Sequence, residues 1–193
     1  MNYIKENLFL ILTVIWIITG IYWVIAGQKI KKAKKKEDIR FRVFYMFFWV
    51  APVLITFFNA IPTQWLNKRL YIENSTLNIV AFILAIVSLA FMVWSRVVLG
   101  ENWSGRVAIK ENHNLITSGP YRYVRHPMYT GFIFAFLWSA VLLGEVRGLI
   151  SFIILIIGIV IKLRMEERFV REAFGEEYIA YAKRVKKIVP LIY

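Results

Sequence analysis

The chain has 193 residues, of which 59% are hydrophobic and 17% aromatic, with 25 Lys and Arg against 12 Asp and Glu. A soluble domain averages about 45–50% apolar residues, and here the excess is gathered into long blocks, so the composition predicts a polytopic membrane protein. The net charge of +13 falls between those blocks, where positive charge sets orientation in a membrane, and it therefore disfavours nucleic-acid binding.

The scarce residue types exclude several kinds of site. The absence of Cys excludes disulfides, thiolate metal sites and a cysteine nucleophile. His113 and His126 are the only two histidines, too few for a multi-histidine metal centre such as that of a di-iron oxygenase. We therefore expect neither a metal nor a nucleic-acid partner.

Five apolar runs are predicted to cross the membrane as helices, which makes the expected fold all-α. They cover residues 7–27, 43–61, 77–100, 128–143 and 149–163. The first is long enough to span rather than be removed as a signal peptide. The last two are short, roughly 23 Å as helices against a ~30 Å hydrocarbon core, so polar residues beside them should lie at or below the interface. Arg96, near the end of the third run, should face a cavity or snorkel to the interface.

The basic residues are distributed unevenly between the two sides of this arrangement. If residues 28–42 face the cytosol, so do 101–127 and 162–193, and these three segments hold 20 of the 25 Lys and Arg. This bias predicts five spans with the N-terminus outside and the C-terminus in the cytosol. The lysine-rich segment 28–42 is read first as an orientation signal, and alternatively as a contact for anionic lipid.

The stretch 119–131 concentrates rings and charges where a polar connection meets an apolar run. Its Gly-Pro pair indicates a turn, and Pro127 suits the first turn of a helix. Arg125 and His126 then lie at the positive end of that helix, beside unpaired backbone donors, an arrangement that binds anions.

Folding the last two apolar runs into an antiparallel hairpin brings two distant segments together. Residues 125–126 and 164–167 lie at equal distances from the turn near Val146, so arginines, a histidine and carboxylates should meet on the cytosolic side. Spacing alone leaves two alternatives open, a juxtamembrane salt bridge and an active site. Beyond this point Gly175 should end the fifth helix, and an amphipathic helix should follow.

Such a cluster suits a zwitterionic, nucleoside-bearing cofactor. It offers an anion site, carboxylates for ribose hydroxyls, and tyrosine faces for a purine or a cation. S-adenosyl-L-methionine has this chemistry, although the residues alone leave it as one cofactor among several. The chain lacks a GxGxxG motif, which excludes a Rossmann-type methyltransferase domain.

The motifs in this half of the chain resemble those of a known family. The run 113–131, HNLITSGPYRYVRHPMYTG, is similar to the signature of the isoprenylcysteine carboxyl methyltransferase family. So are the pair Glu166-Glu167 and the later FGEEY at 174–178. The resemblance covers roughly residues 100–193, and the short five-span form is similar to archaeal and other prokaryotic members. Together with the apolar runs, it predicts one membrane-embedded domain, 1–193, in which 1–100 holds the first three spans and 101–193 forms the methyltransferase core with the last two spans and the C-terminal helix.

The family resemblance implies transfer of a methyl group from S-adenosyl-L-methionine to the C-terminal carboxylate of a prenylated cysteine, with S-adenosyl-L-homocysteine as product. It implies a cytosolic-side cofactor pocket in the cell membrane of a prokaryote. Arg164 would orient the substrate carboxylate, and Glu167 would act with it. The cofactor would be held by Arg106, His113, Asn114, Leu115, Ile116, Gly119, Tyr121, Arg125, His126, Pro127, Met128, Tyr129, Glu166 and Glu167.

Other readings compete with this one. A phospholipid or other lipid-amine methyltransferase of the same architecture shares the RHPxYxG and Glu-Glu elements, which report the cofactor pocket more than the acceptor. A membrane reductase with a similar C-terminal region is disfavoured by the small number of spans. A lipid-binding protein with a degenerate pocket is disfavoured because the motif is intact. The natural acceptor, prenylated cysteine or another lipid-like carboxylate, stays open.

Overall fold

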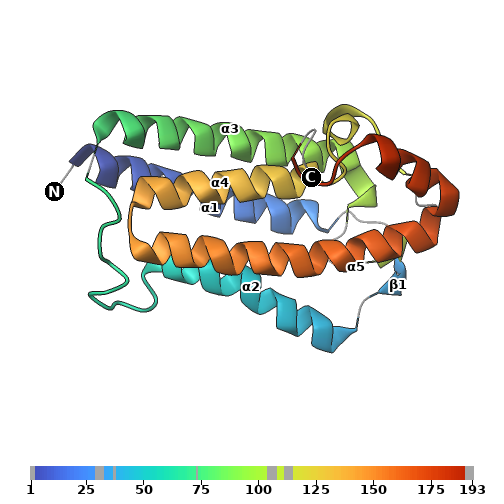
Figure 1. Cartoon of the computed structure of the whole chain (residues 1–193), viewed down its shortest axis with the longest axis horizontal. Helices are drawn as coiled ribbons and strands as arrows, with labels where there is room; N and C mark the ends of the chain where they lie inside the picture. The colour runs from blue at the N-terminus through green and yellow to red at the C-terminus, as the bar shows by residue number, and fades with distance from the viewer. Residues whose placement is uncertain are drawn as a thin grey trace.

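The computed structural model describes residues 3–28, 33–36, 38–72, 74–103, 108–110 and 115–189. In this part of the chain five long helices lie side by side as a bundle (Figure 1). Their bounds are α1 Tyr3–Ala26, α2 Ile39–Phe58, α3 Ser75–Leu99, α4 Pro127–Leu143 and α5 Val146–Arg184. Two short 3-10 helices, η1 Gly100–Asn102 and η2 Gly119–Arg122, and two short strands, β1 Ala33–Lys36 and β2 Ala108–Lys110, complete the described elements.

The helices coincide with the apolar runs of the sequence. Within the described residues, four of them are long and apolar enough to cross a membrane, namely α1, α2, α3 with η1, and α5. The chain is therefore an integral membrane protein with a helical fold. α4 has 17 residues, or about 25 Å, and its crossing remains a prediction.

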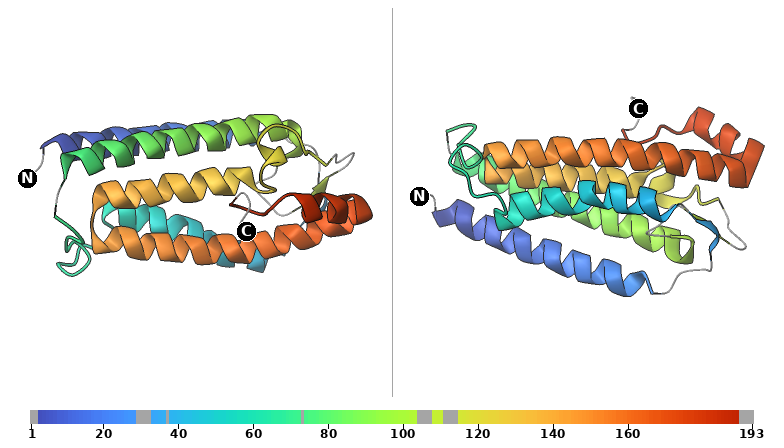
Figure 2. Two further views of the ribbon diagram at one scale, coloured as in Figure 1. Left: turned by 45° about the horizontal axis from the view of Figure 1, so that its top comes forward. Right: turned by 90° about the horizontal axis from the view of Figure 1, so that it is seen from below.

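α4 lies in the middle of the bundle. It packs between α3 and α5, while α2 covers α5, and α1 lies against α3 and α4 (Figure 2, left). Its side chains belong to two hydrophobic cores. Ala135 and Leu142 pack in a core with residues of α1 and α3, whereas Phe136 packs in a core with residues of α5. α4 is apolar on all sides, as a central helix requires.

The two ends of the bundle each bring two connections together. At one end Leu70 N–H donates to Gly144 O at 3.0 Å, and Val146 N–H donates to Lys68 O at 3.0 Å, so the loop after α2 meets the α4–α5 turn. At the other end β1 pairs antiparallel with β2. The sequence analysis did not predict these strands, because the pairing joins two short polar segments far apart in the chain. Their meeting puts segments 28–42 and 101–127 at one end, although the orientation of that end in the membrane remains a prediction.

Arg96 is buried at the same end as the strands. Its two terminal nitrogens donate to Gly100 O and Ala26 O, each at 2.8 Å, and its guanidinium lies 4.4 Å from the centre of the Trp103 ring. It thus places a positive charge at the carboxyl ends of α1 and α3, where the helix dipoles favour it. The side chain reaches toward the helix ends as snorkelling predicts, but Trp103 covers it.

α5 changes direction once, as the sequence predicts. Gly175 has φ 51° and ψ −125°, outside the helical region, so α5 consists of two helical parts, 146–174 and 176–184. The second part turns back toward the bundle (Figure 1), and its Tyr178 and Tyr181 are buried.

Close helix packing makes α5 sensitive to added volume at Gly158. A Cβ there would lie 2.2 Å from Phe48 Cβ of α2, whereas a Cβ at Gly20 of α1 would meet nothing within 4 Å. We expect Gly158→Ala to destabilise the protein by ~1–3 kcal/mol through overpacking. Gly20→Ala has the same effect on helix propensity and serves as the control. Thermal unfolding in detergent measures both, and equal midpoints for the two variants would contradict the close α2–α5 contact.

Candidate active site

The hairpin of α4 and α5 brings together the two segments that the sequence analysis paired. His126 Nε2 lies 2.8 Å from Glu167 Oε1. Arg125 Nε donates to the same oxygen at 3.1 Å, and its Nη2 donates to Oε2 at 3.3 Å. The segment before α4 is thus tied to α5 by a bidentate ion pair and a histidine contact.

Local structure holds Arg125 and His126 in place. Gly119 starts η2 with φ 58°, and Pro127 begins α4. The backbone N–H groups of Arg125 and His126 donate to Lys186 O at 2.7 Å and Lys187 O at 2.9 Å. The C-terminal segment thus uses these two backbone donors, and the anion site expected at the first turn of α4 stays a prediction.

Glu167 accepts hydrogen bonds from three side chains. Besides Arg125 and His126, Tyr178 Oη donates to its Oε1 at 2.6 Å. Glu167 lies one turn beyond the apolar run that ends at Leu163, outside the segment predicted to span the membrane. Burial by itself raises the pKa of Glu167, but the hydrogen bonds from His126, Tyr178 and Arg125 outweigh it and hold that pKa well below the usual range. Glu167 is therefore a carboxylate at neutral pH.

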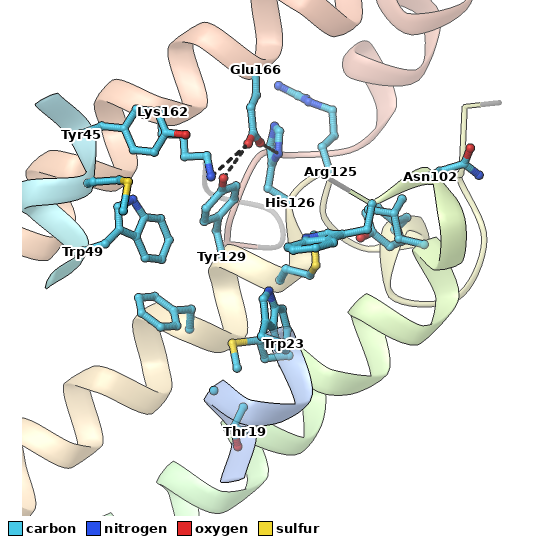
Figure 3. A pocket seen from close by; sticks show the side chains of 18 of the residues that line it. Thr19, Trp23, Tyr45, Trp49, Asn102, Arg125, His126, Tyr129, Lys162 and Glu166 are labelled. Carbon is cyan, nitrogen blue, oxygen red and sulfur yellow. Dashed lines mark hydrogen bonds and ion pairs between the residues drawn. The ribbon is translucent and has the colours of Figure 1, made fainter. Parts of the chain in front are cut away.

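Glu166 points in a different direction, into a cavity (Figure 3). Tyr129 Oη donates to its Oε1 at 2.6 Å. Lys162 Nζ lies 3.9 Å from Oε1, and His126 Nδ1 lies 3.9 Å from Oε2. Glu166 therefore brings a negative charge to the cavity wall, while Glu167 organises the surrounding backbone.

The cavity has a volume of about 650 Å³, within the usual range for small-molecule sites of about 300–1,000 Å³. Side chains of all five long helices line it. One part is polar and includes Tyr121, Arg125, His126, Glu166 and Tyr178. The other part is apolar and includes Trp16, Val53, Phe57, Met92 and Phe132. The cavity can therefore accept a ligand with a polar head and an apolar tail.

Tyr121 joins the polar part to the end of α3. Its hydroxyl donates to Ser95 O at 3.3 Å, and its carbonyl accepts the hydroxyl of Tyr181. Burial is the main reason why the pKa of Tyr121 is raised above its ordinary value, with the nearby Glu166 charge second. The ring thus presents a neutral phenol to the cavity.

The structure sorts the residues that the sequence analysis singled out. Eight of them line the cavity: Leu115, Ile116, Tyr121, Arg125, His126, Met128, Tyr129 and Glu166. Gly119 and Pro127 shape the backbone beside it, and Glu167 lines a smaller neighbouring cavity of about 350 Å³. Arg106, His113 and Asn114 lie outside the described residues.

Arg164 is the exception among the described residues. Its side chain is exposed, and it does not line the cavity. The cation that α5 presents to the cavity is Lys162, two positions earlier and 8% exposed. The sequence analysis missed Lys162, together with Tyr45 and Trp49 of α2 beside it. A lone lysine at the end of an apolar run was the available signal.

These observations define an integral membrane protein whose cavity has a charged, hydrogen-bonded end and an apolar interior. Residues 78–172 match the model of the isoprenylcysteine carboxyl methyltransferase (ICMT) family. The matched region includes α4, most of α3 and the first two-thirds of α5. It also includes Tyr121, Arg125, His126 and Glu166 of the cavity's polar part. The match covers 95 of the 193 residues, so the chain is similar to this family over about half of its length.

Three curated relatives show how far the similarity extends. The chain is 38% identical over 96 residues to protein-S-isoprenylcysteine O-methyltransferase of Schizosaccharomyces pombe, which covers 48% of this chain and 41% of the relative. It is 31% identical over 88 residues to protein-S-isoprenylcysteine O-methyltransferase B of Arabidopsis thaliana, 45% of each chain. It is also 39% identical over 70 residues to methanethiol S-methyltransferase 1 of Bradyrhizobium diazoefficiens, 36% of this chain and 24% of the relative. The chain thus spans less than half the length of these relatives.

The fold is also similar to a solved structure, that of the eukaryotic intramembrane Ras methyltransferase ICMT. The TM-score is 0.53 at 19% identity, over 82% of this chain and 55% of the other. At this identity the likeness concerns the fold alone.

The ion pair between Arg125 and Glu167 should be critical for stability. Their side chains are only 7% and 12% exposed, so Glu167→Ala leaves a guanidinium buried without its carboxylate. We expect a loss of ~3–5 kcal/mol in unfolding free energy. Thermal unfolding in detergent checks this, with the exposed Glu177→Ala as a control that should change stability by less than ~0.5 kcal/mol. A loss no larger than that of the control would show that the cluster does not hold the bundle end together.

Proposed function

We propose that the protein is a membrane methyltransferase that uses S-adenosyl-L-methionine and acts on the carboxylate of a prenylated cysteine or a similar lipid. The observation that carries this proposal is the cavity with a charged end and an apolar end, half of whose lining residues belong to the region that matches the family model. A prenylated cysteine has the same two-part chemistry. Relatives that match this region carry the name protein-S-isoprenylcysteine O-methyltransferase.

The residues at the polar end fit the cofactor. Glu166 offers a carboxylate to hydroxyl or ammonium groups, and the rings of Tyr121, Tyr129 and Trp103 offer faces to a purine or a sulfonium. Leu115, Ile116 and Met128 add apolar walls. When bound, S-adenosyl-L-methionine supplies an electrophilic methyl group. Arg125 serves as a positioning residue, since its guanidinium is occupied by Glu167 and by Ala182 O and Val185 O.

The proposed reaction needs little acid–base catalysis by the protein. A C-terminal carboxyl group has a pKa of about 3.3–3.7, so it is ionised at neutral pH and is itself the nucleophile. The residues of the cavity need only bind the acceptor, orient it and exclude water, and such positioning can be worth ~7–11 kcal/mol. The surrounding tyrosines and tryptophans suit this task because they are large and largely buried.

The apolar part of the cavity supports entry of the acceptor from the lipid. Some of its lining residues are also exposed, namely Ile17 and Gly20 of α1 and Met46 and Phe58 of α2. We propose that a prenyl chain enters between these helices while its carboxylate stays at the polar end. We place that end at the cytosolic face of the membrane, on the distribution of basic residues.

Methyl transfer to defined acceptors tests the proposal. Purified protein in detergent or lipid is incubated with methyl-labelled S-adenosyl-L-methionine and, separately, N-acetyl-S-farnesylcysteine, phosphatidylethanolamine or a short-chain thiol. We expect base-labile label on the farnesylcysteine, as a methyl ester requires. Label on the phospholipid alone would instead show an amine acceptor. Label on the thiol alone would match the name of the methanethiol S-methyltransferase relative.

The position of Glu166 gives a second, separate prediction about the cofactor. Because its carboxylate faces the cavity, Glu166→Gln should weaken binding of S-adenosyl-L-homocysteine about tenfold or more, the scale of one hydrogen bond to a charged group. Calorimetric titration measures this, with Glu177→Gln as the exposed control. Unchanged binding in Glu166→Gln would place the cofactor elsewhere, and equal weakening in the control would show that the effect is not specific to the cavity.

A further inference from the structure

The second, smaller cavity of about 350 Å³ shares one wall with the first. Arg125 lines both cavities, whereas its partner Glu167 lines only the second. The part of α5 before the kink at Gly175 contributes Arg171 to the lining, and the part after it contributes Lys183. The second cavity is therefore bounded by both parts of α5.

The lining of the second cavity carries more positive than negative charge. Among the described residues its one carboxylate is that of Glu167, which already accepts hydrogen bonds from three side chains, Arg125 among them. Lys187 also lines the cavity, but it already interacts within the protein and is not counted as free. In the part of the chain that the structure describes, neither Arg171 nor Lys183 makes a side-chain hydrogen bond or an ion pair. Two positive charges thus line the cavity without a matching negative charge.

Other acidic residues of α5 do not supply that negative charge. Glu172, Glu176 and Glu177 are exposed and do not line the second cavity. Charges in contact with solvent are screened by salt, over about 8 Å at physiological ionic strength. An anion inside the cavity would be attracted more strongly, because it would lie directly between the two cations.

The position of the second cavity along α5 suits the head group of a phospholipid. The apolar run of α5 ends at Leu163, so Glu167 lies ~6 Å and Arg171 ~12 Å beyond it along the helix axis. The head-group region of a bilayer is roughly 5–8 Å thick on each side. A long arginine side chain can reach back toward this region. Clusters of Lys and Arg just beyond a membrane helix attract anionic lipids.

We propose that the second cavity binds a phosphate-bearing anion between Arg171 and Lys183. A guanidinium can hold a phosphate group through two parallel hydrogen bonds, and an ammonium adds a compact positive charge. The phosphate belongs to the head group of an anionic lipid or to a free phosphate compound, and the depth of the cavity favours the lipid. This site is separate from the cofactor and acceptor sites of the proposed function.

A bound anion would also hold the two parts of α5 together. Arg171 precedes the kink at Gly175, and Lys183 follows it. The part after the kink carries Tyr178 and Tyr181, which line the first cavity. An anion that joins the two cations would therefore stabilise the arrangement in which these tyrosines close the polar end of the first cavity.

Binding of two matched lipids tests the proposal. Dihexanoyl phosphatidylglycerol and dihexanoyl phosphatidylcholine have the same tails and a phosphate group, but only the first has a net negative charge. We expect the protein, purified in a neutral detergent, to bind the phosphatidylglycerol about tenfold or more tightly than the phosphatidylcholine, the scale of one hydrogen bond between charged groups. Calorimetric titration at constant ionic strength measures both lipids.

Inorganic phosphate, titrated in the same way, distinguishes the two sources of the anion. Binding as tight as that of the phosphatidylglycerol would show that a free phosphate is sufficient. Weaker binding would assign the site to the lipid head group.

Two pairs of variants make the assignment specific to the second cavity. Arg171→Gln and Lys183→Gln should each weaken the phosphatidylglycerol about fivefold and leave the phosphatidylcholine unchanged. Arg168→Gln and Arg184→Gln remove the same charge from exposed neighbouring positions outside the cavity and should have no such effect. Without lipid, Arg171→Gln and Lys183→Gln should unfold within about 2 °C of the wild type, as surface substitutions do.

The outcomes decide the proposal without reference to methyl transfer. It is overturned if the wild-type protein does not distinguish the two lipids, or if neither Arg171→Gln nor Lys183→Gln reduces the preference. It is also overturned if Arg168→Gln and Arg184→Gln reduce the preference equally, because the lipid would then be attracted by the basic surface as a whole. Since no step uses the cofactor or the acceptor, this inference and the proposed function can fail separately.

Discussion

One carboxylate, that of Glu167, joins three segments on which the cavity depends. Arg125 and His126 precede α4, Glu167 belongs to the first part of α5, and Tyr178 belongs to the part after Gly175. A buried charge cluster of this kind costs desolvation free energy, which these hydrogen bonds offset only when all partners are in place. The cluster therefore fixes the polar end of the cavity in one arrangement, because any segment that moves away leaves the others unsatisfied.

The membrane explains why this cluster lies at an end of the bundle. In the hydrocarbon region backbone groups must be satisfied within helices, so irregular structure is confined to helix ends or protein-covered places. The segment between η2 and α4 is irregular, and its donors are satisfied by residues 186 and 187 of the returning C-terminal segment. That return is possible only because Gly175 takes a positive φ, which an L side chain would resist. The kink and the site are thus parts of the same arrangement.

Hydrophobic patterning predicts the fold well, and helix spacing predicts part of the site. The five helices and the meeting of His126 with Glu167 follow from run lengths and from equal arms about the turn near Val146. Run lengths and spacing do not, however, predict whether a single side chain faces the cavity or the outside of the bundle. Arg164 and Lys162 are about 200° apart around one helix, and it is the packing of α2 and α4 on α5 that makes the Lys162 side an inner one. The β1–β2 pairing and the use of the backbone donors by residues 186 and 187 depend on long-range contacts that leave no local pattern.

The adjacent glutamates show how neighbouring residues come to have different functions. Consecutive residues of a helix point about 100° apart, so two identical side chains at 166 and 167 meet different surroundings. Glu167 accepts hydrogen bonds from three side chains and so has a structural role. Glu166 points toward the cavity, with Tyr129 and Lys162 beside it. In a motif of two adjacent carboxylates, one can therefore stabilise the site while the other faces the ligand. The sequence positions of the pair therefore matter as well as its charge, because a shift of the pair by one residue would leave one of the two places without a carboxylate.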